Sequence, residues 1–338
     1  LSYSDILTGT SWETAIQVPQ TVANSGYQFD GWYENGERVE DFPTTILSDH
    51  TYKAKFKRDF SNIAVEPYED TYDGKPHSVT VKNTISDEDK ILYSTDGIQF
   101  SEDEISYTNV RTDNDGKYNV WVKVVNGNVE SKAIESYIKI KPRNVTLTSG
   151  TDSKKYDGKP LTEESVKVNG DGFVKGEGAS YSEFASITEV GGPIENTFKY
   201  TLNEGTLEEN YEIHQAYGTL TITKNTTDLK FAENNPAGYT GKYDGDSHEA
   251  LTSLVVNGVN GESFTYGEDG VKVEFKVGDK WTEEMPMVKD VGDSKTIDIR
   301  VTVKNYETLN GQITATVTKR DVTLTSGTDS KKYDGKPL

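Results

Sequence analysis

Histidine and acidic side chains are the residues of this chain that are best able to take part in catalysis. The histidines are His50, His77, His214 and His248, and cysteine is absent, so a thiol nucleophile is excluded. His77 and His248 follow two similar Tyr-Asp-Gly motifs and could form a paired metal or acid–base site. Neither has the ligand spacing of a zinc site, and duplication of a residue at the edge of a domain explains the pair more simply. We therefore expect no catalytic, metal or cofactor site.

Acidic clusters could bind calcium or act as a glycosidase pair, but clusters of this kind are typical of solvated loop tips. They are Asp87-Glu88-Asp89, Glu102-Asp103-Glu104 and Glu283-Glu284. The loop at 113–116 (DNDG) has the appearance of a calcium loop. Placing Gly116 at the sixth position of an EF-hand loop puts Arg111 and Val122 where acidic ligands belong. A hairpin turn is the simpler interpretation.

Glycine motifs at 170–172 (GDG) and 176–178 (GEG) do not predict nucleotide binding. No helical periodicity follows them, and the acidic residue between the glycines would repel phosphate. The Tyr-Asp-Gly motif is typical of a turn, in which glycine supplies a positive φ, aspartate tolerates the turn and tyrosine packs the flank.

The tryptophans could stack against sugar rings. They are Trp12, Trp32, Trp121 and Trp281. Trp32 lies in a motif that predicts a core position. Trp121 lies on a strand face with Asn119 and Lys123 and is the candidate ligand-binding residue, although its counterpart in a related module is Arg300. Packing against another module or at a sheet edge is the alternative role.

A long repeat determines where these side chains occur. Arg143–Leu161 (RNVTLTSGTDSKKYDGKPL) returns as Arg320–Leu338 with one change, Asn144 to Asp321, at an offset of 177 residues. Near-identity over this length indicates tandem duplication, and the second copy stops within the motif, so we expect a piece of a longer array. Arrays are typical of spacers or multivalent surfaces, because each module repeats one solution to folding.

The Tyr-Asp-Gly motif divides the repeat into smaller modules. It begins at Tyr72, Tyr156, Tyr243 and Tyr333, at spacings of 84, 87 and 90 residues. Alternating strands that close on lysine (SYIKIK, TLTITK and TATVTK) precede the expected boundaries. The predicted organisation is a first segment (1–58), a first B module (59–141), an A module (142–224), a second B module (225–319) and the truncated start of another A module (320–338).

The two B modules share a histidine after Tyr-Asp-Gly and a similar late strand, at 118–124 in the first and 297–303 in the second. The A module has its own signatures, VNGDGFVKGEGA at 168–179 and ENYEI at 209–213. The order is therefore B, A, B and the beginning of A.

Composition limits what the array can bind. The chain has 338 residues, 56 acidic against 36 basic, and a net charge of −20, which opposes nucleic acid and anionic membranes. Its 33% of hydrophobic residues suits several small cores better than one large core. Without cysteine, stability must come from packing, a metal or another crosslink. No apolar run reaches transmembrane length and no signal peptide stands at Leu1, which says nothing about the parent protein because we expect this chain to be a fragment. For the fragment we expect no membrane span, and we also expect a monomer.

Strand signals dominate the sequence. Alternation at 118–124 places Tyr118 and three valines on one face, and similar runs occur at 197–202, 271–277 and 297–303. Turn signals such as Asn-Gly and Asp-Gly separate the runs. The predicted fold is all-β, with small immunoglobulin-like (Ig-like) sandwiches arranged in an elongated rod.

Residues 26–57 (GYQFDGWYENGERVEDFPTTILSDHTYKAKFK) resemble the Listeria-Bacteroides repeat, the B-repeat of internalin-type surface proteins. That resemblance implies a β-grasp-like fold for 1–58, with an opening strand that is incomplete or missing before Leu1. The motifs KKYDGKPL, GDGFVKGEGA and GTLTIT resemble Ig-like YDG and glycine-rich repeats of Gram-positive cell-wall proteins. The paired late strands of the first B module, ILYSTDGIQFS and DGKYNVWVKV, are similar to those of bacterial Ig-like domains. Ile297 stands where the first B module has Tyr118, so a tyrosine corner is not general.

These resemblances imply a secreted, wall-attached adhesin or stalk on a Gram-positive cell. We predict a non-enzymatic region that spaces and presents a distal binding head. Direct, multivalent binding of host mucin glycans or an extracellular matrix protein by the repeats is the alternative. Stalk domains of this kind sometimes carry a Lys–Asn or Lys–Asp isopeptide bond, which would lower the intact mass by one ammonia, but the sequence nominates no residues for it.

Overall fold

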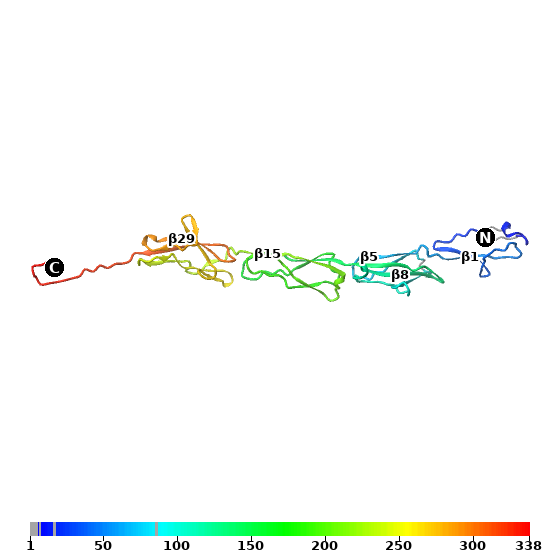
Figure 1. The fold of residues 1–338 in the computed structure, drawn as a ribbon, viewed down its shortest axis with the longest axis horizontal. Coiled ribbons are helices and arrows are strands. Elements are labelled where there is room, and N and C mark those ends of the chain that lie inside the picture. Colours follow the sequence, from blue (N-terminus) through cyan, green and yellow to red (C-terminus); the bar gives the residue numbers. More distant parts are fainter. Residues whose placement is uncertain (1–5, 7, 16–17, 85–86) are drawn as a thin grey trace. The chain divides into compact units, whose positions relative to one another are not determined.

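The computed structural model describes residues 6, 8–15, 18–84 and 87–338, and β-strands form most of its regular structure (Figure 1). The chain divides into two compact units. The first contains Leu1–Thr146, Val168–Ser180 and Thr201–His214, and the second contains Leu147–Lys167, Tyr181–Tyr200 and Gln215–Leu338. This division falls inside the A module. The residues that join the A module to each B module therefore lie together within one compact unit.

The first segment has one helical turn and a three-stranded sheet of order β2-β1-β3. Its elements are α1 (Trp12–Ala15), β1 (Tyr27–Glu34), β2 (Glu37–Arg38) and β3 (Lys53–Arg58). The β1–β3 register shifts between Phe29 and Gly31, and Gly31 has a positive φ of +151°. The β-grasp assignment of 1–58 stays a prediction.

The first B module packs a sheet of order β5-β10-β8-β7, with β9 on β8, against the pair β4-β6 (Figure 1). Its elements are β4 (Ala64–Glu66), β5 (Tyr68–Thr71), β6 (Thr80–Lys82), β7 (Lys90–Ser94), η1 (Asn114–Gly116), β8 (Lys117–Asn126), β9 (Val129–Glu130) and β10 (Ile134–Lys141). Alternation along β8 buries Val120, Val122 and Val124 completely, as the sequence predicts. The 113–116 loop is a 3₁₀ turn that leads into β8, where we expected a hairpin.

The A module has sheets of order β13-β11-β17 and β12-β18-β15 and a pair β14-β16. Its elements are β11 (Arg143–Ser149), β12 (Asp152–Lys155), β13 (Val166–Gly170), β14 (Ala179–Ser182), β15 (Gly191–Glu195), β16 (Lys199–Leu202), η2 (Glu208–Asn210), β17 (Tyr211–Ala216) and β18 (Thr219–Thr223). Val145 and Leu147 of β11 and Leu220 of β18 are fully buried.

The second B module has a main sheet of order β21-β30-β29-β26-β27, with β19-β24-β25, β20-β23 and β22-β28 beside it. Its early elements are β19 (Lys230–Phe231), β20 (Ala237–Gly238), β21 (Thr240–Lys242), β22 (His248–Glu249), β23 (Leu251–Ser253), β24 (Val255–Asn257), η3 (Val259–Gly261) and β25 (Ser263–Thr265). The later elements are β26 (Lys272–Val277), β27 (Lys280–Thr282), β28 (Met287–Val288), η4 (Val291–Asp293), β29 (Lys295–Thr302) and β30 (Leu309–Thr318).

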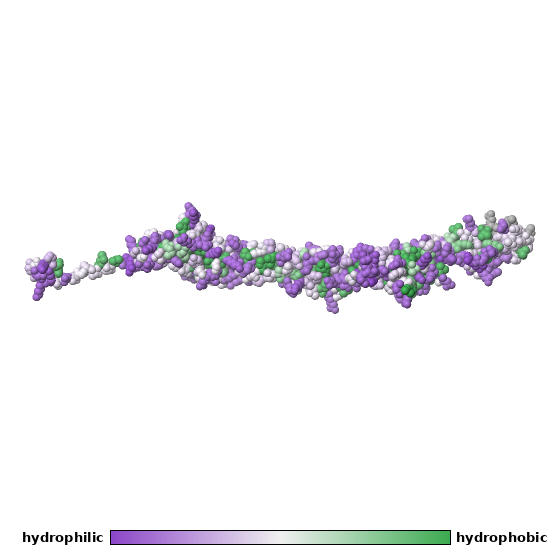
Figure 2. Space-filling model, viewed as in Figure 1, coloured by the Kyte–Doolittle hydropathy of each residue, from purple (hydrophilic) through white to green (hydrophobic). Residues whose placement is uncertain are grey.

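The fold is thus all-β, built from small Ig-like sandwiches, as predicted. Hydrophilic residues cover most of the visible face in Figure 2, with hydrophobic residues in small patches. Among the described residues, no helix is long and apolar enough to cross a membrane.

The Tyr-Asp-Gly motifs at Tyr72, Tyr156 and Tyr243 each begin where a parallel strand pair ends. Those pairs are β5 with β10, β12 with β18, and β21 with β30. The next backbone N–H, that of the motif tyrosine, donates to the last residue of the closing strand: Tyr72 to Lys141 at 2.9 Å, and Tyr156 to Thr223 and Tyr243 to Thr318, both at 2.8 Å. This register carries each tyrosine to the end of its module.

Candidate functional site at the module junctions

The Tyr-Asp-Gly motif forms the turn that the sequence predicts. Gly74 and Gly158 have φ values of +79° and +73°, which favour glycine. The carboxylate of Asp73 accepts a hydrogen bond from the backbone N–H of Lys75 at 2.9 Å, and Asp157 accepts one from Lys159 at 3.0 Å. The turn holds the tyrosine before it in a fixed orientation.

A half-buried carboxylate, that of Glu177, joins the first B module to the A module. The hydroxyl of Tyr72 donates to Glu177 Oε1 at 2.6 Å, and the hydroxyl of Tyr211 donates to Glu177 Oε2 at 2.7 Å. The two rings pack edge to face, with centroids 5.7 Å apart. The N–H of Val174 donates to the Tyr211 hydroxyl at 3.0 Å. Tyr72 belongs to the first B module and the other residues belong to the A module, so this cluster crosses the junction.

The junction between the A module and the second B module repeats the arrangement. Tyr156 donates to Glu262 Oε1 at 2.6 Å, and Tyr306 donates to Glu262 Oε2. The rings again meet edge to face, at 5.5 Å, and the N–H of Val259 donates to the Tyr306 hydroxyl at 2.8 Å. Tyr156 is 5% exposed and Tyr306 is fully buried. We call the two sets (Tyr72, Glu177, Tyr211 and Tyr156, Glu262, Tyr306) the Tyr–Glu–Tyr clusters.

Burial sets the electrostatics of these clusters. Desolvation, assisted by the hydrogen bond to the glutamate, raises the pKa of Tyr156 and of Tyr211 to about 12. The same causes raise the pKa of Tyr72 and Tyr306 well above the ordinary value. At neutral pH each glutamate therefore receives two phenol hydrogen bonds, which a charged acceptor strengthens.

An asparagine beside the second tyrosine ties each module back to the one before it. Asn210 Oδ1 accepts from the N–H of Val110 at 2.8 Å, and Asn305 Oδ1 accepts from the N–H of Val190 at 3.0 Å. Each amide nitrogen donates to the side chain of the residue before that valine, Asn109 at 3.0 Å and Glu189 at 2.6 Å.

Close backbone approach gives the motif glycine a second role. A Cβ on Gly74 would lie 2.8 Å from Val174 Cγ1, and a Cβ on Gly158 would lie 2.7 Å from Asn260 Nδ2. At contacts this short, a side chain fits only if the facing side chain moves or is replaced by a different one. Glycine is thus favoured both by the turn and by the close contact with the next module.

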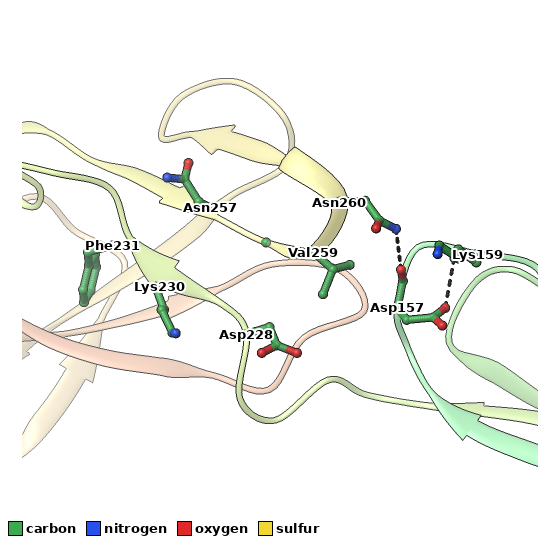
Figure 3. Close-up of a pocket in the computed structure, with 9 residues that line it drawn as sticks. Asp157, Lys159, Asp228, Lys230, Phe231, Asn257, Val259 and Asn260 are labelled. Carbon is green, nitrogen blue, oxygen red and sulfur yellow. Dashed lines mark hydrogen bonds between the residues drawn. The ribbon is translucent and has the colours of Figure 1, made fainter.

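A shallow pocket of about 640 Å³ lies beside the second cluster (Figure 3). Residues of both modules line it, and Asn260 Nδ2 donates across it to the Asp157 carbonyl at 2.5 Å. Its charged residues balance, with Asp157 and Asp228 against Lys159 and Lys230. This lining resembles a polar seam between modules and offers no set of residues for a defined reaction.

An ion pair joins the first segment to the first B module. The Arg58 Nη2 atom lies 2.8 Å from Asp89 Oδ2, and the two side chains are 2% and 0% exposed. Asn126 Nδ2 also donates to Asp89 Oδ1, at 3.1 Å. We expected Asp89 to be solvated with its acidic neighbours, and that expectation is wrong because Arg58 reaches it from the preceding segment.

The predicted candidates do not come together. His77 Nε2 lies 2.8 Å from Asp73 Oδ1, and its ring stacks on Tyr68 at 4.0 Å. His248 repeats this with Asp244, at 3.1 Å, and with Tyr239, at 4.2 Å. Each histidine therefore braces its own Tyr-Asp-Gly turn. His50 contacts Glu34 and His214 contacts Glu212, so the histidines lie at separate places.

Trp121 is half-buried, and the turn at 95–98 covers one face of its indole ring. A Cβ on Gly97 would lie 3.3 Å from three indole atoms. In the second B module the Arg300 guanidinium stacks on Trp281, 4.2 Å from the ring centroid. A ligand role for Trp121 stays a prediction. Trp12 is 8% exposed, whereas Trp32, which we expected in the core, is half-buried against Phe29.

Within the described part of the chain, no group of three or more His, Cys, Asp or Glu residues could hold a metal ion. Lysine does not occur among the buried residues of that part. An isopeptide bond needs a lysine deprotonated by burial, so the described packing supplies no candidate for it.

Sequence analysis missed the junction residues, although the signal was present. Both glutamates end a Val-x-Gly-Glu motif, at 174–177 and 259–262, and both second tyrosines follow asparagine, at 210–211 and 305–306. Aligning the A module with the second B module would have revealed the two motifs. Comparing only the B modules with each other hides them, because the first B module lacks both.

No family model and no curated protein matches the chain. Among solved structures, immunoglobulin domains 1–4 of Sidekick-1 are similar at 8% identity, covering 76% of this chain and 75% of that one, with a TM-score of 0.19. The human desmocollin-1 ectodomain matches at 11% identity (86% and 68% covered, TM-score 0.26). Mouse cadherin-23 EC22–24 matches at 14% (77% and 97% covered, TM-score 0.27). Scores this low carry no conclusion about function.

Proposed function

We propose that this chain is a non-catalytic spacer region of an extracellular, wall-attached bacterial surface protein and presents a distal binding head. The repeated Tyr–Glu–Tyr cluster carries the proposal, because the tyrosine at the end of one module hydrogen-bonds the glutamate of the next module and packs against its second tyrosine. A hydrogen bond between two modules adds little to the stability of either module alone, and it restrains the angle between them.

Hydrophobic packing at the second junction supports a stiff connection. One apolar cluster includes Tyr156, Leu161 and Leu220 of the A module together with Val256 and Tyr306 of the second B module. Domains in one chain usually move unless their interface is large and apolar. Shared burial of this kind, added to charge-assisted hydrogen bonds, favours a semi-rigid row of modules over flexible beads.

The length of the strands supports a spacing role. The closing strand β10 has eight residues, and strands of that length rise about 27 Å at ~3.4 Å per residue. A row of such modules would exceed about 100 Å.

Small-angle X-ray scattering of the full chain tests the proposal. We expect a maximum dimension above about 100 Å, and a more flexible profile for the double variant Tyr72→Ala/Tyr156→Ala, because truncation removes the tyrosine that spans each junction. A compact wild-type particle, or a double variant with an unchanged profile, would contradict the spacer role. Micromolar glycan-array hits that disappear in Trp121→Ala would favour direct binding instead.

A further inference from the structure

The third Tyr-Asp-Gly turn has the geometry of the two that are engaged by a following module. Its Tyr243 N–H donates to Thr318 at 2.8 Å, its Asp244 carboxylate accepts from the N–H of Asp246 at 2.9 Å, and Gly245 has a φ of +91°. Tyr243 is nevertheless 39% exposed, against 4% for Tyr72 and 5% for Tyr156. A Cβ on Gly245 would meet nothing within 4 Å.

A second element of the engaged junctions is also present and exposed. At each engaged junction a valine N–H donates to the asparagine of the next module; these valines are Val110 and Val190. Each valine lies three residues after a residue, Tyr107 or Ile187, that forms an isolated β-bridge next to the Tyr-Asp-Gly turn. In the second B module His248 pairs with Val288, and the residue three positions later is Val291. Val291 is 39% exposed.

The chain also carries the linker that an engaged junction uses. Arg143 Nη1 donates to the carbonyl of Tyr72 at 3.1 Å, and Arg143 Nη2 donates to Asp171 at 2.7 Å. Arg320 is the counterpart of Arg143 in the long repeat, at the offset of 177 residues. The turn and the valine are thus in place, and the sequence supplies the linker arginine after β30.

We propose that the surface formed by Tyr243, Gly245 and Val291 is a docking site for an A-type module, one with the sequence of residues 142–224. The glutamate of that module's Val-x-Gly-Glu motif accepts a hydrogen bond from the Tyr243 hydroxyl, and the valine of the same motif packs on Gly245. Its Asn-Tyr pair supplies the second phenol and the amide that bonds Val291.

The docking surface excludes a module of the first B type. Gly127 stands there at the position of Tyr306, and Asp89 stands in the carboxylate loop, where it holds Arg58. The acid of that module is one methylene shorter and the second phenol is missing. The Tyr243 hydroxyl is thus left without an acceptor at the reach of glutamate and without the ring partner found at the engaged junctions.

Nitration by tetranitromethane tests the proposal on the full chain, with and without a copy of residues 162–224 joined after Leu338 to complete an A module. Nitration proceeds through the phenolate, so each unit of raised pKa slows it about tenfold. We expect Tyr243 to react readily in the present chain and at least about tenfold more slowly in the extended chain, approaching Tyr72 and Tyr156. An unchanged rate at Tyr243 would overturn the proposal.

Two matched chains separate specific docking from simple coverage. Glu177→Gln with Tyr211→Phe, made only in the added copy, should restore the fast nitration of Tyr243. A copy of residues 59–141 joined after Lys319 should leave that rate unchanged. Equal protection in all three chains would assign the effect to bulk and overturn the proposal.

A crosslink gives a second measurement that does not depend on reagent access. The chain has no cysteine, so cysteines at Gly245 and at the copy of Val174 form one disulfide. In the engaged junction, a Cβ on Gly74 lies 3.9 Å from Val174 Cβ, within disulfide range, so Gly74→Cys/Val174→Cys is the reference. We expect comparable oxidation of both pairs. The control is the chain carrying the 59–141 copy, with cysteine at Gly245 and three residues before the copy of Asp89, the position that corresponds to Val174. If the Gly245→Cys pair with the A-type copy oxidises no faster than this control, the proposal is overturned.

Discussion

The first junction and the two later junctions place a carboxylate at the same position in the module but give it different partners. Asp89, Glu177 and Glu262 each lie one or two residues before a strand (β7, β14 and β25). Asp89 pairs with the Arg58 guanidinium of the first segment, whereas each glutamate accepts hydrogen bonds from two tyrosine hydroxyls. The position of the acid is shared, and the chemistry of its partner distinguishes which neighbour it holds.

The two solutions differ in physical cost. A buried ion pair removes two charges from water and depends on good geometry. A Tyr–Glu–Tyr cluster removes one charge only partly from water, and its donors stay neutral until strongly alkaline pH. Tyrosines therefore suit a junction that recurs through an array, and the ion pair suits the single boundary with an unrelated segment.

Breaking the ion pair should have the largest effect. We expect Asp89→Asn to destabilise the first junction by about 3–5 kcal/mol, because Arg58 is left buried without a counter-charge. Hydrogen exchange of peptides from β3 and β7 measures this locally. The exposed control Asp103→Asn should stay within about 0.5 kcal/mol of wild type. Equal exchange in the two variants would show that Asp89 does not hold the junction.

Neutralising a cluster glutamate should have a smaller effect. We expect Glu262→Gln to cost about 1.5–3 kcal/mol, because two charge-assisted hydrogen bonds weaken while the size of the side chain is kept. Urea unfolding followed by hydrogen exchange around β25 and β29 provides the measurement, with the exposed Glu268→Gln as control. A loss confined to the A module, with β25 and β29 unaffected, would argue against a shared cluster.

Alkaline pH should separate the two kinds of junction. The pKa of Tyr156 is raised from 10.0 to about 12, so its contribution is complete below pH 10 and is lost as the pH rises from 10 to 12. The stability difference between wild type and Tyr156→Phe should therefore shrink over that range, by an amount on the order of 2 kcal/mol. The effect of Asp89→Asn should persist there, because arginine stays charged. A pH-independent effect of Tyr156→Phe would contradict this assignment.

The unengaged turn should give the smallest effect. Tyr243 has the same backbone geometry as Tyr156 but is 39% exposed, so Tyr243→Phe should change the free energy of unfolding by less than about 0.5 kcal/mol. Thermal unfolding of Tyr243→Phe beside Tyr156→Phe makes the comparison. Similar losses in both would mean that the tyrosine hydroxyl stabilises the turn itself and not the junction.

The sequence predicts the strands well because their signal is local. Alternation at 118–124 identifies β8 and the buried faces of Val120, Val122 and Val124 without any knowledge of distant residues. The Tyr-Asp-Gly turn is equally local, since glycine and aspartate determine it within three positions. Both predictions are confirmed.

The junction clusters could not be predicted in the same way. Their hydrogen bonds join Tyr72 to Glu177 and Tyr156 to Glu262 across 105 and 106 residues, and the glutamate lies 34 residues before its second tyrosine in one module and 44 in the other. Unequal loops conceal that correspondence. Asp89 was wrongly expected to be solvated, because it follows two other acidic residues and acidic clusters are usually exposed to solvent.

The central claim is that the carboxylates at the junctions fix the angle between neighbouring modules. Spin labels on cysteines introduced at the exposed Ser153 of the A module and Asp279 of the second B module report this angle as a distance distribution. We predict a single narrow distribution in the otherwise wild-type chain and a broad one after Glu262→Gln with Tyr156→Phe. An equally narrow distribution in that variant, or a broad one in the wild-type chain, would contradict the account.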